Sequence, residues 1–72
     1  MSATLARHAE QRRAAAELTE LALAETRAWY EYATAPEGAE NDFSADSPHM
    51  RWHAAMDAWA GALAEYNRQY GG

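Results

Sequence analysis

The sequence predicts an all-α protein, an antiparallel two-helix hairpin that dimerises into a four-helix bundle. The 72 residues contain no Val and no Ile, the residues that fit a β-sheet best. Leu, Met and Ala, which favour helices, are prominent among the apolar side chains instead. Two long segments flank one polar stretch that contains Pro36 and Gly38. A chain this short holds a single domain, residues 1–72, with room for two helices and one connection.

The first helix is expected over about residues 3–35. Ser2 or Thr4 can act as its N-cap, because a hydroxyl oxygen accepts a hydrogen bond from a free amide of the first turn. No Gly or Pro interrupts the segment before Pro36, which disfavours a helical conformation in the residue that precedes it. The connection that follows, about residues 36–47, is polar and has no helical period, so it predicts a loop.

The second helix is expected over about residues 48–70. Ser47 and Pro48 form a start signal, a capping hydroxyl followed by a proline in the first turn, and the Gly71-Gly72 pair ends the segment. Large apolar residues recur at spacings of 4, 3, 4, 3 and 4 and therefore lie on one face: Trp52, Met56, Trp59, Leu63, Tyr66 and Tyr70. We expect this stripe to form the core of the hairpin.

The first helix carries two apolar faces, about 140° apart at 100° per residue. One face, with Leu18, Trp29 and Tyr32, is expected to pack on the second helix. The other, with Leu5, Leu23 and Tyr30, lies too far round for the same helix to cover it. Because a domain of this size gains little from a single seam, we expect a homodimer to bury the second face.

The net charge of -5 is concentrated in the expected loop, which has four carboxylates and no basic residue. Phe43 is the single large apolar residue among them, so the predicted partner-binding surface is an acidic rim around one aromatic anchor: Glu37, Glu40, Asp42, Phe43 and Asp46. A loop with Phe43 folded back onto the helix ends is the alternative. The chain has no basic stripe, which argues against direct binding to nucleic acid.

His49, His53 and Asp57 follow one another at intervals of four residues on the second helix, so their side chains stand one above another. Two imidazoles one turn apart can both reach a transition metal. Glu25 of the first helix is a candidate further ligand. The same glutamate could instead accept a hydrogen bond from a Trp indole or a Tyr hydroxyl. The predicted metal site is therefore an alternative to a purely structural arrangement, and we expect no resident cofactor.

Short matches to two known families can be tested against these expectations. Trp59-Ala60-Gly61 resembles the Trp-x-Gly motif of the small secreted helical hairpins of type VII systems, in which the motif lies at the turn. Here it falls inside the expected second helix. The terminal Gly71-Gly72 is similar to the end of ubiquitin-type modifiers, whose strands this sequence does not predict.

Together these patterns predict a non-enzymatic interaction protein that binds a basic surface of a partner protein. Two helices form a seam without the enclosed pocket that catalysis needs. The absence of Cys and of a membrane-spanning or leader-like segment favours the cytoplasm. Arg without Lys, in an Ala-rich chain, is typical of a GC-rich bacterial or phage genome, which suggests an accessory or inhibitor protein. The alternatives are a metal-binding bundle and a small-ligand binder at a dimer seam.

Overall fold

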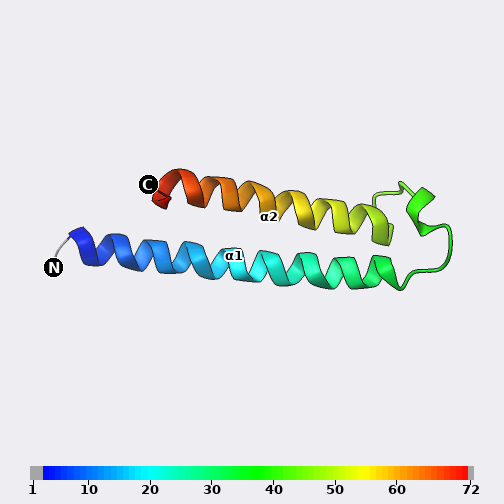
Figure 1. The fold of residues 1–72 in the computed structure, drawn as a ribbon, viewed down its shortest axis with the longest axis horizontal. Helices are drawn as coiled ribbons and strands as arrows, with labels where there is room; N and C mark the ends of the chain where they lie inside the picture. The colour runs from blue at the N-terminus through cyan, green and yellow to red at the C-terminus, as the bar shows by residue number, and fades with distance from the viewer. Residues whose placement is uncertain (1–2, 72) are drawn as a thin grey trace.

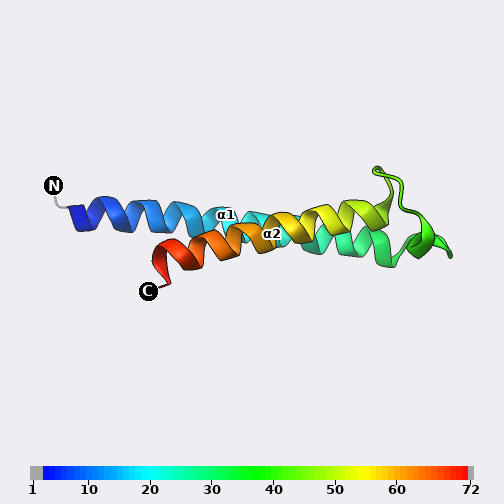
Figure 2. The ribbon, with the colours of Figure 1, turned by 90° about the horizontal axis from the view of Figure 1, so that it is seen from above.

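The computed structural model describes residues 3–71 and is an all-α hairpin of two antiparallel helices (Figure 1). Helix α1 spans Ala3–Ala33, a short 3₁₀ helix η1 spans Ala39–Asn41, and helix α2 spans Pro48–Tyr70. The hairpin measures 56 × 17 × 17 Å. Figures 1 and 2 show the two helices side by side, with both chain ends opposite the loop. The predicted all-α class is confirmed, and no strand occurs in the described part of the chain.

Helix α1 ends two residues before the predicted boundary at Ala35. Thr34 ends the helix in a turn, where its hydroxyl donates to the carbonyl oxygen of Tyr30 at 2.8 Å and its amide donates to the same oxygen. Pro36 then prevents the helix from continuing, as the sequence predicted. At the other end, Thr4 lies inside the helix and is not its N-cap. Ser2 lies outside the described residues.

The loop contains one element that the sequence analysis did not predict, the single 3₁₀ turn η1. Gly38 precedes it with φ 95°, a left-handed conformation that glycine adopts without the steric cost of a Cβ atom. The amide of Asn41 donates to the carbonyl of Gly38 at 3.0 Å and closes the turn. A three-residue turn has no apolar period, which is why the pattern of the sequence did not reveal it.

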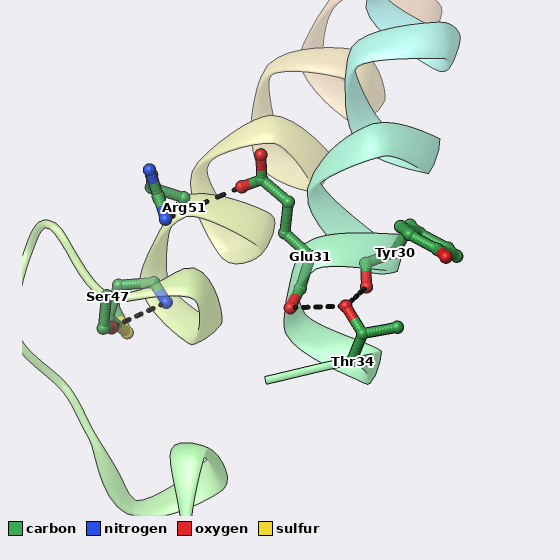
Figure 3. A network of polar contacts seen from close by, with 6 residues as sticks. Tyr30, Glu31, Thr34, Ser47 and Arg51 are labelled. Atoms are coloured by element: carbon green, nitrogen blue, oxygen red, sulfur yellow. Dashed lines mark hydrogen bonds and ion pairs between the residues drawn. The ribbon is translucent and has the colours of Figure 1, made fainter. Parts of the chain in front are cut away.

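Helix α2 begins and ends where the sequence predicted. The Ser47 hydroxyl oxygen accepts a hydrogen bond from the amide of Met50 at 3.2 Å, and Pro48 occupies the first turn (Figure 3). Ser47 is only 4% exposed, so its capping bond is shielded from water. At the C-terminal end Gly71 is the C-cap residue, and its amide donates the last helical hydrogen bond to the carbonyl of Asn67 at 2.8 Å.

Polar contacts fix the register of the two helices along the hairpin. Near the chain ends, the Gln11 side chain donates to the Tyr66 hydroxyl at 3.1 Å. Near the loop, Glu31 and Arg51 form an ion pair at 3.6 Å (Figure 3). Both partners of this pair are more than half exposed, so the pair orients the helices and adds little free energy. The apolar stripe of α2, from Trp52 to Tyr70, is half-buried along the seam.

The single hairpin has no apolar core in the described residues, because none of their apolar side chains is buried. The radius of gyration is 16.2 Å, against about 11 Å for a compact domain of this length. The accessible surface is 5488 Å², about 1,000 Å² above the value typical of an 8.0 kDa globular monomer. No helix within residues 3–71 has the length and hydrophobicity needed to cross a bilayer.

Candidate functional site

The loop end of the hairpin holds a cluster of stacked rings, which we call the ring cluster: Trp29, Tyr32, His49, Trp52 and His53. Helix α1 supplies the first two and the first turns of α2 supply the others. Tyr32 lies parallel to His49, with centroids 4.8 Å apart and an interplanar angle of 8°. It also stacks on Trp52 at 5.6 Å. Such pairs add stabilisation beyond the area they bury, so they fix the helix ends against each other.

Glu25 of α1 forms a hydrogen bond with the ring cluster. Its carboxylate accepts a hydrogen bond from the indole Nε1 of Trp52 at 2.8 Å. Trp29 packs on the same indole, with ring centroids 4.9 Å apart. Of the two roles that the sequence allowed for Glu25, the structure shows the hydrogen bond to a tryptophan. A charged acceptor strengthens such a bond, and it holds the Trp52 ring in one orientation.

His49 and His53 meet edge to edge at the start of α2. Their Nε2 atoms lie 3.1 Å apart, and the ring centroids 4.8 Å. For this contact to be a hydrogen bond, one imidazole must carry its proton on Nε2 while the other presents a lone pair. His49 is 8% exposed, and its Nδ1 is buried without a hydrogen-bond partner. The pair is therefore held by the surrounding rings and by its own contact.

The other two predicted ligands do not join the histidines. Asp57 lies on the same helix and is exposed, one turn beyond His53. Glu25 is engaged with Trp52. Within residues 3–71, no three side chains of His, Cys, Asp or Glu come together in an arrangement that could hold a metal ion. The described residues thus supply two nitrogen ligands at the start of α2, one from His49 and one from His53.

The predicted partner-binding residues all lie on the exposed loop: Glu37, Glu40, Asp42, Phe43 and Asp46. Phe43 is 69% exposed and still touches the ring cluster, since its ring centroid is 5.2 Å from that of His49. The Phe43 ring therefore has features of both arrangements expected from the sequence, the exposed anchor and the ring folded back onto the helix ends. One edge rests on the helix end, and most of its surface faces solvent.

Hydrogen bonds order the loop around Phe43. The Asp42 carboxylate accepts from the amide of Ser44 at 3.0 Å, and the Ser47 hydroxyl donates to the carbonyl of Asp42 at 2.9 Å. Bonds from the Ser44 hydroxyl and amide lower the pKa of Asp42, and the charge of His49 adds a smaller lowering. Asp42 therefore stays ionised at neutral pH, and the Phe43 ring is presented next to a fixed negative charge.

The predicted dimer face lies on α1, away from the partner helix. Leu5, Leu23 and Tyr30 are all more than half exposed. Trp29, which was expected to face α2, contacts Trp52 and yet remains 47% exposed. Helix α1 thus presents Leu23 and Tyr30 on the side away from α2, and Leu5 lies on the same face near the start of the helix.

Sequence reasoning missed two contributors to these sites. Tyr32 was assigned to the core face, and its stacking on His49 was not predicted. Arg7 donates to the carbonyl of Gln69 at 3.0 Å and lies 5.5 Å from the ring centroid of Tyr70. Because the helices are antiparallel, one known contact, such as that between Gln11 and Tyr66, would have indicated both neighbourhoods to within about one helical turn. A single sequence does not supply that first pair.

Comparisons with protein-family models, with curated proteins and with solved structures found no significant match. Trp59-Ala60-Gly61, the motif that resembles the Trp-x-Gly signature, lies in the middle of α2 and not at the turn between the helices. The structure therefore does not support that resemblance. The function has to be argued from the surfaces of this chain alone.

Proposed function

We propose that this chain is a non-enzymatic interaction protein that dimerises through α1 and binds a basic surface of a partner protein through its acidic loop. One observation carries the proposal. Within residues 3–71 no apolar side chain is buried, whereas five large ones are exposed: Leu5, Leu23, Trp29, Tyr30 and Phe43. Exposed apolar side chains that share one face mark a candidate interaction site, and Leu5, Leu23 and Tyr30 share one face of α1. Four of these five lie on α1 and the fifth lies at the tip of the loop.

The area that the hairpin exposes supports a homodimer. The excess over a compact monomer, about 1,000 Å², is similar to the roughly 800 Å² that each partner buries in a standard interface. A second hairpin that packs on the Leu5, Leu23 and Tyr30 face would complete a four-helix bundle. In a two-fold symmetric dimer the same face serves both copies, so a single apolar face is sufficient.

The loop has the chemistry of a docking surface for a cationic partner. Its four carboxylates are exposed, and none of them forms an ion pair with another described residue. Charge of one sign steers the encounter with a basic surface, while an aromatic ring supplies the contact that is buried on binding. Phe43 meets this requirement, because its ring is exposed but positioned by His49 and by the Asp42 turn. We propose that the chain is a bacterial or phage accessory or inhibitor protein. Its partner in this proposal is a host-defence or nucleic-acid-handling complex.

The loop is tested by affinity purification with the tagged chain followed by mass spectrometry. The expected result is retention of a protein with a basic surface, which is weakened by added salt since exposed charges are screened over about 10 Å at 0.1 M. Glu40→Arg combined with Asp42→Arg, and separately Phe43→Ala, should each abolish this retention with helix content unchanged. Glu10→Arg combined with Glu17→Arg is the matched control, because it makes the same charge change on α1. Equal retention by the loop variants would contradict the proposal.

A further inference from the structure

The Nε2 atoms of His49 and His53 lie next to each other within the ring cluster at the start of α2. Their separation is 3.1 Å, and the ring centroids are 4.8 Å apart. If the two rings pointed straight at each other along one line, the centroids would be about 5.4 Å apart, since an imidazole centroid lies about 1.15 Å from its nitrogen. The shorter observed centroid distance means that the two ring axes are not collinear, and an inclination of both axes toward a shared point accounts for it.

This inclination matches the geometry of a chelate. An ion placed about 2.05 Å from both nitrogens, the usual metal–imidazole distance, would subtend an angle of about 98° at a nitrogen separation of 3.1 Å. With both ring axes directed at that ion, the centroids would be about 4.8 Å apart, which is the observed value. We propose that His49 and His53 chelate one divalent transition-metal ion through their Nε2 atoms. This site lies apart from the dimer face of α1 and adjoins the loop surface assigned to partner binding, where Phe43 contacts His49.

The surrounding rings prepare the pair for this role. Tyr32 stacks on one face of His49, Phe43 contacts the same imidazole, and Trp52 packs against His53 with centroids 5.2 Å apart. Because these ring contacts restrict both imidazoles, little side-chain freedom remains to be lost on binding. Each imidazole has to present a neutral Nε2, so its remaining proton sits on Nδ1. When the metal binds, the ring that carries its proton on Nε2 loses that proton and takes one up on Nδ1. The neutral pair of histidines therefore releases no net proton.

Two further observations define which ion fits and how tightly. No third His, Cys, Asp or Glu of the described chain joins the pair, so water fills the other coordination positions. Cu²⁺ accepts such a set of two nitrogens and solvent oxygens and stands highest in the stability order of the divalent ions, whereas structural Zn²⁺ sites use four protein ligands. The buried Nδ1 of His49 lacks an outer hydrogen-bond partner, which is why we expect micromolar and not tighter affinity.

The experiment is calorimetric titration of the whole 72-residue chain with Cu²⁺, and with Zn²⁺ for comparison. One Cu²⁺ ion should bind per chain, more tightly than Zn²⁺, and raise the melting temperature. His53→Gln should weaken Cu²⁺ binding at least tenfold, because glutamine keeps a polar side chain of similar length without the ring nitrogen. His49→Ala should do the same. His8→Ala is the matched control, since it removes an exposed imidazole from the first turns of α1, and it should bind as the unaltered chain does.

Circular dichroism of each ion-free variant shows whether the hairpin is retained. Absence of binding by the unaltered chain, binding unaffected by His53→Gln in a folded variant, or an equal loss in His8→Ala would each overturn the proposal. Partner retention in the purification assay does not depend on the ion, so the two proposals fail separately.

Discussion

Truncation of Leu23 is expected to separate dimerisation from the folding of the single hairpin. Leu23 lies on the face of α1 opposite the seam and is 51% exposed. Complete burial of a leucine side chain contributes about 1.5–3 kcal/mol. Burial of the exposed half of Leu23 in a dimer interface would therefore contribute about 1 kcal/mol. In a two-fold symmetric dimer the contribution occurs twice. Leu23→Ala should therefore weaken dimerisation by about 2 kcal/mol, a roughly 30-fold rise in Kd.

Sedimentation equilibrium over a range of micromolar concentrations measures this shift directly. The unaltered chain should sediment at about twice 8.0 kDa. Ala24→Ser serves as control, because this exposed neighbour lies 100° further round the helix. The reasoning fails if the unaltered chain is a monomer that melts cooperatively, or if Leu23→Ala leaves the dimer constant unchanged.

The remaining predictions concern the fold and the loop. Ser47→Ala should lower the free energy of unfolding by about 1–2 kcal/mol in chemical denaturation, since it removes the cap of α2 and the bond to Asp42; an unchanged value would show that the cap is dispensable. Trp59→Ala should cost about 3 kcal/mol, the lower end for a tryptophan because the ring is half-buried, and a near-native melting temperature would show that the stripe is not the seam. The lowered pKa of Asp42 predicts that its contribution to loop order persists above pH about 3.8 and disappears as pH falls through the still lower folded-state value. The NMR shift of the Ser44 amide follows this loss, and a midpoint above pH 4 would contradict it.

Much of the hairpin could be predicted because local signals set its boundaries. Ser47 caps α2 as its position before Pro48 indicated, and α2 covers the predicted residues. The apolar spacing also placed Trp52 and Tyr66 on the face that contacts α1. The end of α1 was misplaced by two residues, because the chain leaves the helix before Pro36 in a tighter turn, in which the amide of Ala35 donates to the carbonyl of Tyr32 at 3.1 Å. The apolar spacing of the sequence does not indicate how many residues such a turn takes.

The details of the candidate sites were less predictable, since they depend on the register between the helices. The spacing of His49 and His53 indicated that their imidazoles could meet, and the 3.1 Å contact agrees with that expectation. Whether Glu25 would face the histidines or an indole could not be decided from one helix alone. The stacking of Tyr32 on His49 likewise arises from a contact between elements, for which the sequence has no local signal.

The arrangement of side chains separates the residues that hold the hairpin from those proposed to bind other molecules. The α2 stripe, Gln11 and Glu25 supply contacts between the two helices, whereas Leu23 and Tyr30 make none that the fold needs. A hairpin that leaves the apolar side chains of its described residues incompletely covered gains stability from whatever covers them. The proposed dimerisation would therefore be linked to folding through α1. The loop differs, because Phe43 rests on the fixed imidazole of His49, so partner binding there would bury a ring that the fold already positions.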